Sequence, residues 1–286
     1  MRPRAENVSF LARCAVSLVV FLLFAAACDE SPDAARRRVS QLRGRYTSDE
    51  FVSRAKRGDS RAVGLFLAAG MDPNVKDRWG DTSLVAAAQR GYGDVVKMLL
   101  EKGADANGKN KDGFTALIAA SAWGHSDIVL ALLDRGARVN DKTEAGSTAL
   151  MLAAKDGNSD VVRALLDRGA DVNAKNESGF SPLMFAVRVG RAEIVGMLLD
   201  TGAKVNETSR GGFTPLIVAA AWGYPDIVRA LLERGADANA QTDDGFTALM
   251  IAAKRGYVEI VRLLEQSGAK ESDERPTGTL ILPDMM

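Results

Sequence analysis

The chain repeats itself every 33 residues over most of its length. Three series of glycines keep this spacing: the first opens a short phrase such as Gly113-Phe114-Thr115-Ala116-Leu117, the second follows eleven residues later, and the third starts a Gly-Ala pair. The series are Gly80, Gly113, Gly146, Gly179, Gly212 and Gly245; Gly91, Gly124, Gly157, Gly190, Gly223 and Gly256; and Gly103, Gly136, Gly169, Gly202, Gly235 and Gly268. A fixed period of this size predicts stacked supersecondary units in place of one closed core.

One unit, residues 110–142, illustrates the local structure that the sequence predicts. Thr115 is a good N-cap because its hydroxyl accepts from free backbone N–H groups of the first helical turn, so a short helix is expected from there to Gly124. A second helix begins near Asp127, whose carboxylate is favourable at the positive end of the helix dipole. Its apolar stripe is Ile128, Val129, Leu132 and Leu133. Gly136 suits a left-handed C-cap, and the polar stretch after it is expected to form a hairpin to the next unit.

These features together resemble the ankyrin repeat family. The resemblance rests on the phrase Gly-x-Thr-x-Leu, the Ala-Ala pairs, the spaced glycines, the string Ile-Val-x-x-Leu-Leu and the string Gly-Ala-x-x-Asn, and it covers about four-fifths of the chain. It implies an all-α repeat solenoid, in which helix-turn-helix units are joined by β-hairpin loops. About seven units are expected within residues 45–270, near 45–76, 77–109, 110–142, 143–175, 176–208, 209–241 and 242–270. The first has Thr47 in place of the hairpin glycine, as a capping repeat with solvent on one side can tolerate.

The sequence departs from the family at one position of each unit. The family's Thr-Pro-Leu-His phrase carries a histidine, but this chain has an apolar residue there six times: Val85, Ile118, Met151, Met184, Ile217 and Met250. These side chains are expected to pack between inner helices, where each contributes on the order of 1.5–3 kcal/mol if fully buried. The alternative is an apolar groove, because methionine also suits adaptable binding surfaces.

The first thirty residues have the pattern of an export signal. Arginines precede an uncharged run from Cys14 to Cys28, whose most apolar part is too short for a membrane span of about 20 residues. The small residues Ala25-Ala26-Ala27 follow, so residues 1–27 are predicted to be a secretory signal peptide. Together with Cys28 they resemble the lipobox of bacterial lipoproteins, in which that cysteine carries lipid, although Ala25 stands where leucine is common. Cleavage by the ordinary signal peptidase is the alternative.

Two further segments lie outside the repeats. Residues 28–44 contain Pro32 and the run Arg36-Arg37-Arg38 with little apolar periodicity, so a flexible tether is predicted. This basic stretch is either solvated or lies against anionic lipid headgroups. The C-terminal tail, residues 271–286, contains Leu280-Ile281-Leu282 and is either disordered or folded over the apolar edge of the last repeat.

Composition argues against several kinds of chemistry. The 37 Lys plus Arg balance 37 Asp plus Glu, so no basic face for nucleic acid is implied. With two Cys and one His, the chain lacks the material for a Cys/His zinc cluster, a disulfide framework or an oriented Ser-His-Asp triad. The histidine, His125, is expected to be a turn residue on the groove side. We therefore expect no enzymatic activity, no metal and no cofactor.

Exposed aromatic residues are the best candidates for binding a partner. By the resemblance, hairpin tips and inner helices form a concave docking surface; Trp79, Phe114, Phe180, Phe213 and Phe246 are placed near the hairpins, and Trp123 and Trp222 at the ends of inner helices. For the phenylalanines, covering their own turn is an equally good interpretation. Cations such as Arg90 and Arg188 are expected near the same surface, mixed with carboxylates such as Asp112 and Asp156, so they do not indicate the charge of the partner.

The function expected from the sequence is that of a non-enzymatic, monomeric scaffold that binds an unknown protein partner and does not bind nucleic acid. The scaffold is expected to be held at a bacterial membrane, facing the periplasm, through lipid on Cys28. Two alternatives remain. One is a regulatory or protective subunit of a periplasmic enzyme. The other is a secreted effector directed toward a host or prey cell.

Overall fold

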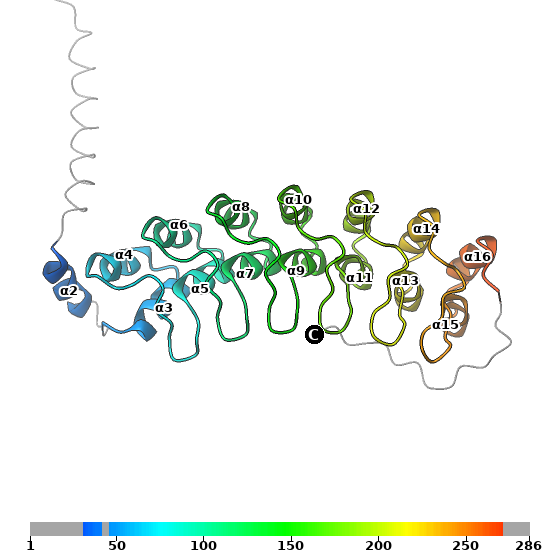
Figure 1. The fold of residues 1–286 in the computed structure, drawn as a ribbon, viewed down its shortest axis with the longest axis horizontal. Helices are drawn as coiled ribbons and strands as arrows, with labels where there is room; N and C mark the ends of the chain where they lie inside the picture. The colour runs from blue at the N-terminus through cyan, green and yellow to red at the C-terminus, as the bar shows by residue number, and fades with distance from the viewer. Residues whose placement is uncertain (1–30, 42–45, 271–286) are drawn as a thin grey trace, which may run out of the picture.

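The computed structural model describes residues 31–41 and 46–270, and these form an all-α repeat solenoid (Figure 1). Fifteen helices lie in the described residues, and the predicted fold class is confirmed. Inner helices form one layer, outer helices form a second, and the loops between units extend from the inner layer on the side away from the outer helices. No strand forms in this part of the chain; isolated antiparallel β-bridges join Lys76 to Thr82, Lys142 to Thr148 and Gln241 to Thr247 at the hairpin loops.

Each unit contributes one inner and one outer helix. The inner helices are α3 (Ser48–Lys56), α5 (Ser83–Arg90), α7 (Ala116–Ala122), α9 (Ala149–Asp156), α11 (Pro182–Arg188), α13 (Pro215–Trp222) and α15 (Ala248–Arg255). The outer helices are α4 (Ser60–Ala68), α6 (Gly93–Glu101), α8 (Ser126–Asp134), α10 (Ser159–Asp167), α12 (Ala192–Asp200), α14 (Pro225–Glu233) and α16 (Val258–Gln266).

The repeated phrase sets where each inner helix begins. In every unit from α5 to α15 a Thr or Ser side chain caps the helix by accepting from the backbone N–H three residues later, as Thr115 does from Ile118 at 3.2 Å. Four inner helices end at a left-handed glycine, which supplies the positive φ that other residues adopt at a cost: Gly91, Gly157, Gly223 and Gly256. The helices are therefore short because their caps recur with the period.

The core is one continuous apolar layer between the two rows of helices. It includes the residues at the family's histidine position, since Val85, Ile118, Met151, Met184 and Ile217 are buried and only Met250, in the last unit, is partly exposed. The interpretation that these side chains pack between inner helices is confirmed for the five buried ones, which leaves no apolar groove at that position.

Successive units are also joined by a repeated hydrogen-bonded clamp. An asparagine near the end of each unit donates to a glycine carbonyl of the next unit and accepts from a backbone N–H two residues beyond that glycine; for Asn140 the distances are 3.1 Å to Gly169 O and 2.8 Å to Asp171 N. The six asparagines are Asn74, Asn107, Asn140, Asn173, Asn206 and Asn239. Because the clamp closes at every junction, it fixes the rise from one unit to the next.

The prediction of a flexible tether over residues 28–44 is wrong for residues 32–41. They form the helix α2 (Pro32–Gln41), which packs against α4 and buries Ala35 and Val39. The guanidinium of Arg36 donates from Nε to Ala69 O at 3.3 Å. The two buried positions are four residues apart, which places them on one face of a helix, and α4 would otherwise leave its outward face uncovered.

The predicted signal peptide 1–27, the lipidation site Cys28 and the tail 271–286 lie outside the described residues. In the part of the chain that the structure does describe, no helix is both long enough and apolar enough to cross a membrane.

Candidate binding groove

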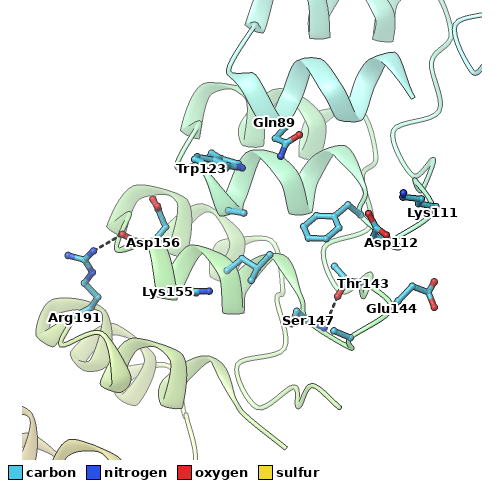
Figure 2. Close-up of a pocket in the computed structure, with 14 residues that line it drawn as sticks. Gln89, Lys111, Asp112, Trp123, Thr143, Glu144, Ser147, Lys155, Asp156 and Arg191 are labelled. Atoms are coloured by element: carbon cyan, nitrogen blue, oxygen red, sulfur yellow. Dashed lines mark hydrogen bonds between the residues drawn. The ribbon is translucent and has the colours of Figure 1, made fainter. Parts of the chain in front are cut away.

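A large hollow lies between inner helices and hairpin loops in the first half of the solenoid. It has a volume of about 740 Å³. Its walls come from the C-terminal ends of α5, α7 and α9 on one side and from two hairpins on the other, as Figure 2 shows. The lining residues are Gln89, Lys111, Asp112, Phe114, Ala122, Trp123, Thr143, Glu144, Ala145, Ser147, Leu152, Lys155, Asp156 and Arg191.

Trp123 is the most prominent apolar side chain of this groove. It forms the C-cap of α7, and 61% of its surface is exposed. Helix α7 ends here because Gly124 follows with a φ of +71°, which turns the chain toward α8 and leaves the indole outside the core. The partly buried Phe114 and Leu152 complete the apolar lining. An exposed tryptophan beside a hollow with an apolar floor is the arrangement that binds a large apolar group.

Backbone hydrogen bonds form the hairpin wall of the groove in advance of any ligand. Glu144 N donates to Asp112 O at 3.1 Å, which ties the tips of two successive hairpins. Within the second hairpin, Ser147 N donates to the hydroxyl of Thr143 at 3.1 Å. On the opposite side, Arg191 Nη2 donates to the carbonyl of Asp156 at 2.9 Å (Figure 2). The groove therefore needs little ordering when a partner binds.

Comparison with known proteins agrees with this architecture. A family profile described as ankyrin repeats in three copies matches residues 52–143, 136–209 and 203–274. The chain belongs to the ankyrin repeat family. A search of curated proteins found no match. Among solved structures, the human ASB11 ankyrin repeat domain is similar with a TM-score of 0.69 and 26% identity, over 78% of this chain and 99% of that one.

Ankyrin repeats are generally scaffolds for protein–protein interaction and are typically non-enzymatic. As many as 620 solved chains are similar to this one, so the ankyrin fold by itself does not choose a partner. What distinguishes this protein must come from the side chains that its repeats expose.

Three of the phenylalanines predicted to bind a partner do not reach the ankyrin groove surface. Phe180, Phe213 and Phe246 are buried in the core, with at most 7% of their surface exposed. Phe180 packs edge-on against Phe185, at 6.2 Å between ring centroids. Each ring stands just before the cap of its inner helix, so the hairpin folds it back over that helix. Their role is structural, and the prediction that they contact a partner is wrong.

The remaining predicted residues lie at different places on the surface. Trp222, at the end of α13, is 44% exposed and repeats the position of Trp123 three units later, without lining the same hollow. Trp79, 56% exposed at the first hairpin tip, lies beneath the guanidinium of Arg78 at 4.7 Å. The groove thus brings together Phe114 and Trp123 from the predicted set.

Arg78, whose guanidinium lies over Trp79, also has a structural role. Its backbone N–H and its Nε donate to the two carboxylate oxygens of Asp49, each at 2.8 Å. The bond from the backbone N–H of Arg78, together with its guanidinium, holds the pKa of Asp49 below its usual value. This pair joins α3, whose unit lacks a hairpin phrase, to the hairpin of the next unit.

Several groove residues were not identified from the sequence, among them Leu152, Lys155 and Arg191. Two of them could have been found from the 33-residue register, because Leu152 and Lys155 stand at the positions that Ala119 and Ala122 occupy in the preceding inner helix. Arg191 stands at the turn position of His125. There the His125 ring lies over Gly91 of the preceding unit, with Nε2 3.3 Å from Gln89 O. The described residues contain no group of three or more His, Cys, Asp or Glu able to hold a metal.

Proposed function

We propose that this ankyrin protein docks a partner protein in its concave groove, with Trp123 as the central anchor. The observation that carries the proposal is the exposed indole beside a preformed hollow of about 740 Å³. Aromatic side chains in such positions supply much of the binding energy at interface centres. Trp222 supplies a second anchor at the equivalent place on α13.

The exposed surface of Trp123 is better explained by binding than by a contribution to stability. Burying a tryptophan removes roughly 150–250 Å² from water, and in the free protein the Trp123 surface remains exposed. A partner gains this apolar area without having to displace a packed side chain.

The test is affinity capture from native extract with the full chain, compared with the double variant Trp123→Ala and Trp222→Ala. The double variant should capture at least tenfold less of a specific protein than the parent does. A single hot-spot residue contributes about 2 kcal/mol or more to binding, so this loss is expected even if only one of the two tryptophans is an anchor. The variant should keep the parent's melting temperature, because exposed side chains contribute little to stability.

A matched control removes two exposed apolar side chains from the outer helices, Leu130→Ala and Val258→Ala, which are 44% and 69% exposed. The control should capture the partner like the parent. Equal capture by the tryptophan variant and the parent would contradict the proposal, and so would a large loss of helical structure in the tryptophan variant.

We also propose that the protein is exported and held by lipid on Cys28, with the solenoid facing the periplasm. The support comes from the sequence: arginines, then a short apolar run, then Ala25-Ala26-Ala27-Cys28. Two or more acyl chains are needed for stable residence at a membrane, whereas one gives marginal binding. The captured protein then decides between a general scaffold, a subunit of a periplasmic enzyme and an effector that acts on another cell.

A further inference from the structure

The ankyrin fold lines up equivalent residues of successive units in rows along the solenoid. One row, which we call the helix-end ridge, consists of the residues at the C-terminal ends of the inner helices α5 to α15: 89–90, 122–123, 155–156, 188–189, 221–222 and 254–255. It carries a single carboxylate, Asp156, and five cations: Arg90, Lys155, Arg188, Lys254 and Arg255. In a chain with no net charge, this row is strongly positive.

The ridge cations are free of ion pairs, unlike many elsewhere on the molecule. On the outer helices, Arg168 pairs with Asp134 at 2.7 Å, Arg234 with Asp200 at 2.7 Å and Arg229 with Glu259 at 3.3 Å, in each case between adjacent units. Within the described residues, none of the five ridge cations forms such a pair. Part of the outer-helix charge is thus paired between units, whereas all five ridge cations are available to another molecule.

The hairpins form the opposing side of the groove and carry no net charge. Residues 76–81, 109–114, 142–147, 175–180, 208–213 and 241–246 carry seven carboxylates and seven cations. An inner helix of eight residues separates the two sides by about 12 Å. Figure 2 shows both sides at the groove, with Trp123, Lys155 and Asp156 on the helix-end side and Lys111, Asp112 and Glu144 on the hairpin side.

Helix energetics explain the ridge cations but not its tryptophans. A cation in the last turn of a helix interacts favourably with the helix dipole, so Lys155 or Arg255 has a structural reason to be there. Trp123 and Trp222 replace such cations in two of the six units and are 61% and 44% exposed, so neither the dipole nor the core accounts for them. The two indoles therefore mark where a ligand lies along the ridge.

We infer that the docked partner is a polypeptide segment that presents carboxylates and two bulky apolar side chains to the helix-end ridge. This inference rests on the proposed function and specifies the chemistry of the partner. A polypeptide can carry carboxylates on the side facing the ridge and neutral or basic groups on the side facing the hairpin tips. Nucleic acid is anionic on every side, and the hairpin side of the groove, which has no net charge, offers it no second basic wall. A flat membrane surface does not enter a concave groove.

The spacing of the tryptophans sets the spacing of the partner's anchors. Trp123 and Trp222 are separated by three steps between adjacent packed inner helices, α7 to α13. At roughly 8–10 Å for each step, the separation is about 24–30 Å. An extended chain covers that length in about 7–9 residues. The midpoint of the segment then faces Lys155 and Arg188, which is where its carboxylates are expected.

The probe is a phage-displayed library of random peptides of about 16 residues, which extend to roughly 50 Å, selected on the full chain. Selected peptides should be rich in Asp and Glu and carry aromatic or large aliphatic residues. Their affinity is then measured for the parent and for the ridge variant Lys155→Gln, Arg188→Gln and Lys254→Gln. Glutamine already stands at this position as Gln89, so these changes are compatible with the helix ends.

The matched control makes the same three changes of charge on the outer helices, Lys97→Gln, Arg163→Gln and Arg262→Gln. The ridge variant should bind the selected peptides about tenfold more weakly, and the difference should shrink as salt rises, because exposed charges are screened. The control should bind like the parent.

Three outcomes would overturn the inference: no peptide is selected, the selected peptides are not acidic, or the ridge variant binds them like the parent. Ridge-dependent binding of fluorescent single-stranded DNA or of phosphatidylglycerol vesicles would replace it by another ligand class. The proposed function fails separately. If the tryptophan variant loses the captured protein while the ridge variant retains it, the groove is the docking site and only the charge argument is wrong.

Discussion

At the scale of single residues, the turn between the two helices of a unit has a role in joining units. The side chain at this position lies over the C-terminal glycine of the preceding inner helix, as Asn158 does over Gly124. Asn158 also donates from Nδ2 to Gly124 O at 3.0 Å and accepts at Oδ1 from Val161 N at 3.0 Å, which caps α10. One side chain thus holds an outer-helix start against an inner-helix end, and it requires a residue without Cβ beneath it.

Gly124→Ala should destabilise the protein more than Gly136→Ala. Both glycines have positive φ, at +71° and +80°, so alanine is strained at either by roughly 1–2 kcal/mol. At Gly124 a Cβ would also lie 2.8 Å from Asn158 Nδ2, whereas at Gly136 nothing lies within 4 Å. Urea unfolding should show an extra loss of about 1 kcal/mol at Gly124. Equal losses would mean that the Asn158 contact gives way without cost.

A carboxylate near the end of one unit makes stability depend on pH. Burial raises the pKa of Glu207, but hydrogen bonds and charge from Lys175, at 2.7 Å, and Lys204, at 3.2 Å, outweigh burial, so its pKa lies below the usual value. A depressed folded-state pKa stabilises the native state above the unfolded-state pKa, and this contribution disappears as pH falls through the folded-state pKa.

Glu207→Gln should therefore lower the free energy of unfolding near neutral pH by up to about 1 kcal/mol, since the pair is partly screened by solvent. Below the folded-state pKa of Glu207, parent and variant should converge. Urea titrations from about pH 7 down to the onset of acid unfolding measure the difference. A difference that stays constant as the pH falls would show that the glutamate acts through packing instead of charge.

At the scale of elements, the helices are too short to be stable alone, and contacts between units make up for this. An inner helix of seven to nine residues is below the roughly 12–15 residues at which isolated helices become stable in water. Packing of each inner helix on the next, together with the asparagine clamp, supplies the missing stability. Helix α2 extends the same principle to the N-terminal end, where it covers α4.

Asn140→Ala should cost more than Asn239→Ala, although each removes the same pair of hydrogen bonds. The two bonds contribute about 1–3 kcal/mol together. In a linear array, breaking a central junction weakens the coupling of two halves, while breaking the last one frees only α15 and α16. Denaturant unfolding measures both losses, and hydrogen exchange locates them. If both variants lose the same stability over the whole solenoid, the array unfolds as a single unit.

At the scale of the whole molecule, the solenoid presents two different surfaces. The outer helices carry ion pairs between neighbouring units, such as Arg168 with Asp134. The concave side carries unpaired cations and two exposed tryptophans.

Cys28→Ser should move the protein from the membrane fraction to the soluble fraction, because the acyl chains that would hold it there can no longer be attached. The chain offers a matched control in its other cysteine, since Cys14→Ser should leave fractionation unchanged. Immunoblots of separated membranes and supernatant give the answer. If the Cys28 variant stays with the membrane, the solenoid is held there without lipid on this residue.

The sequence by itself determined the units, their helices and their caps. A 33-residue period with Thr or Ser before each inner helix and glycine after each helix leaves few alternatives, because capping and apolar spacing are local properties. It also favoured burial of the apolar residues at the family's histidine position, which holds for five of the six. The sequence did not predict the helix over residues 32–41. Its two small apolar residues stand in a basic stretch and give little helical periodicity, and they become buried only when they pack against α4.

Only the tertiary structure decided which repeated residues face solvent. Phe180 and Trp123 are both aromatic residues near the edge of an inner helix, yet one is buried and the other is 61% exposed, because the hairpin folds back over the start of the helix and nothing covers its end. The same geometry lines up the cations at the C-terminal ends of the inner helices. Burial and charge rows are decided by contacts between units, and these contacts exist only once the solenoid is stacked.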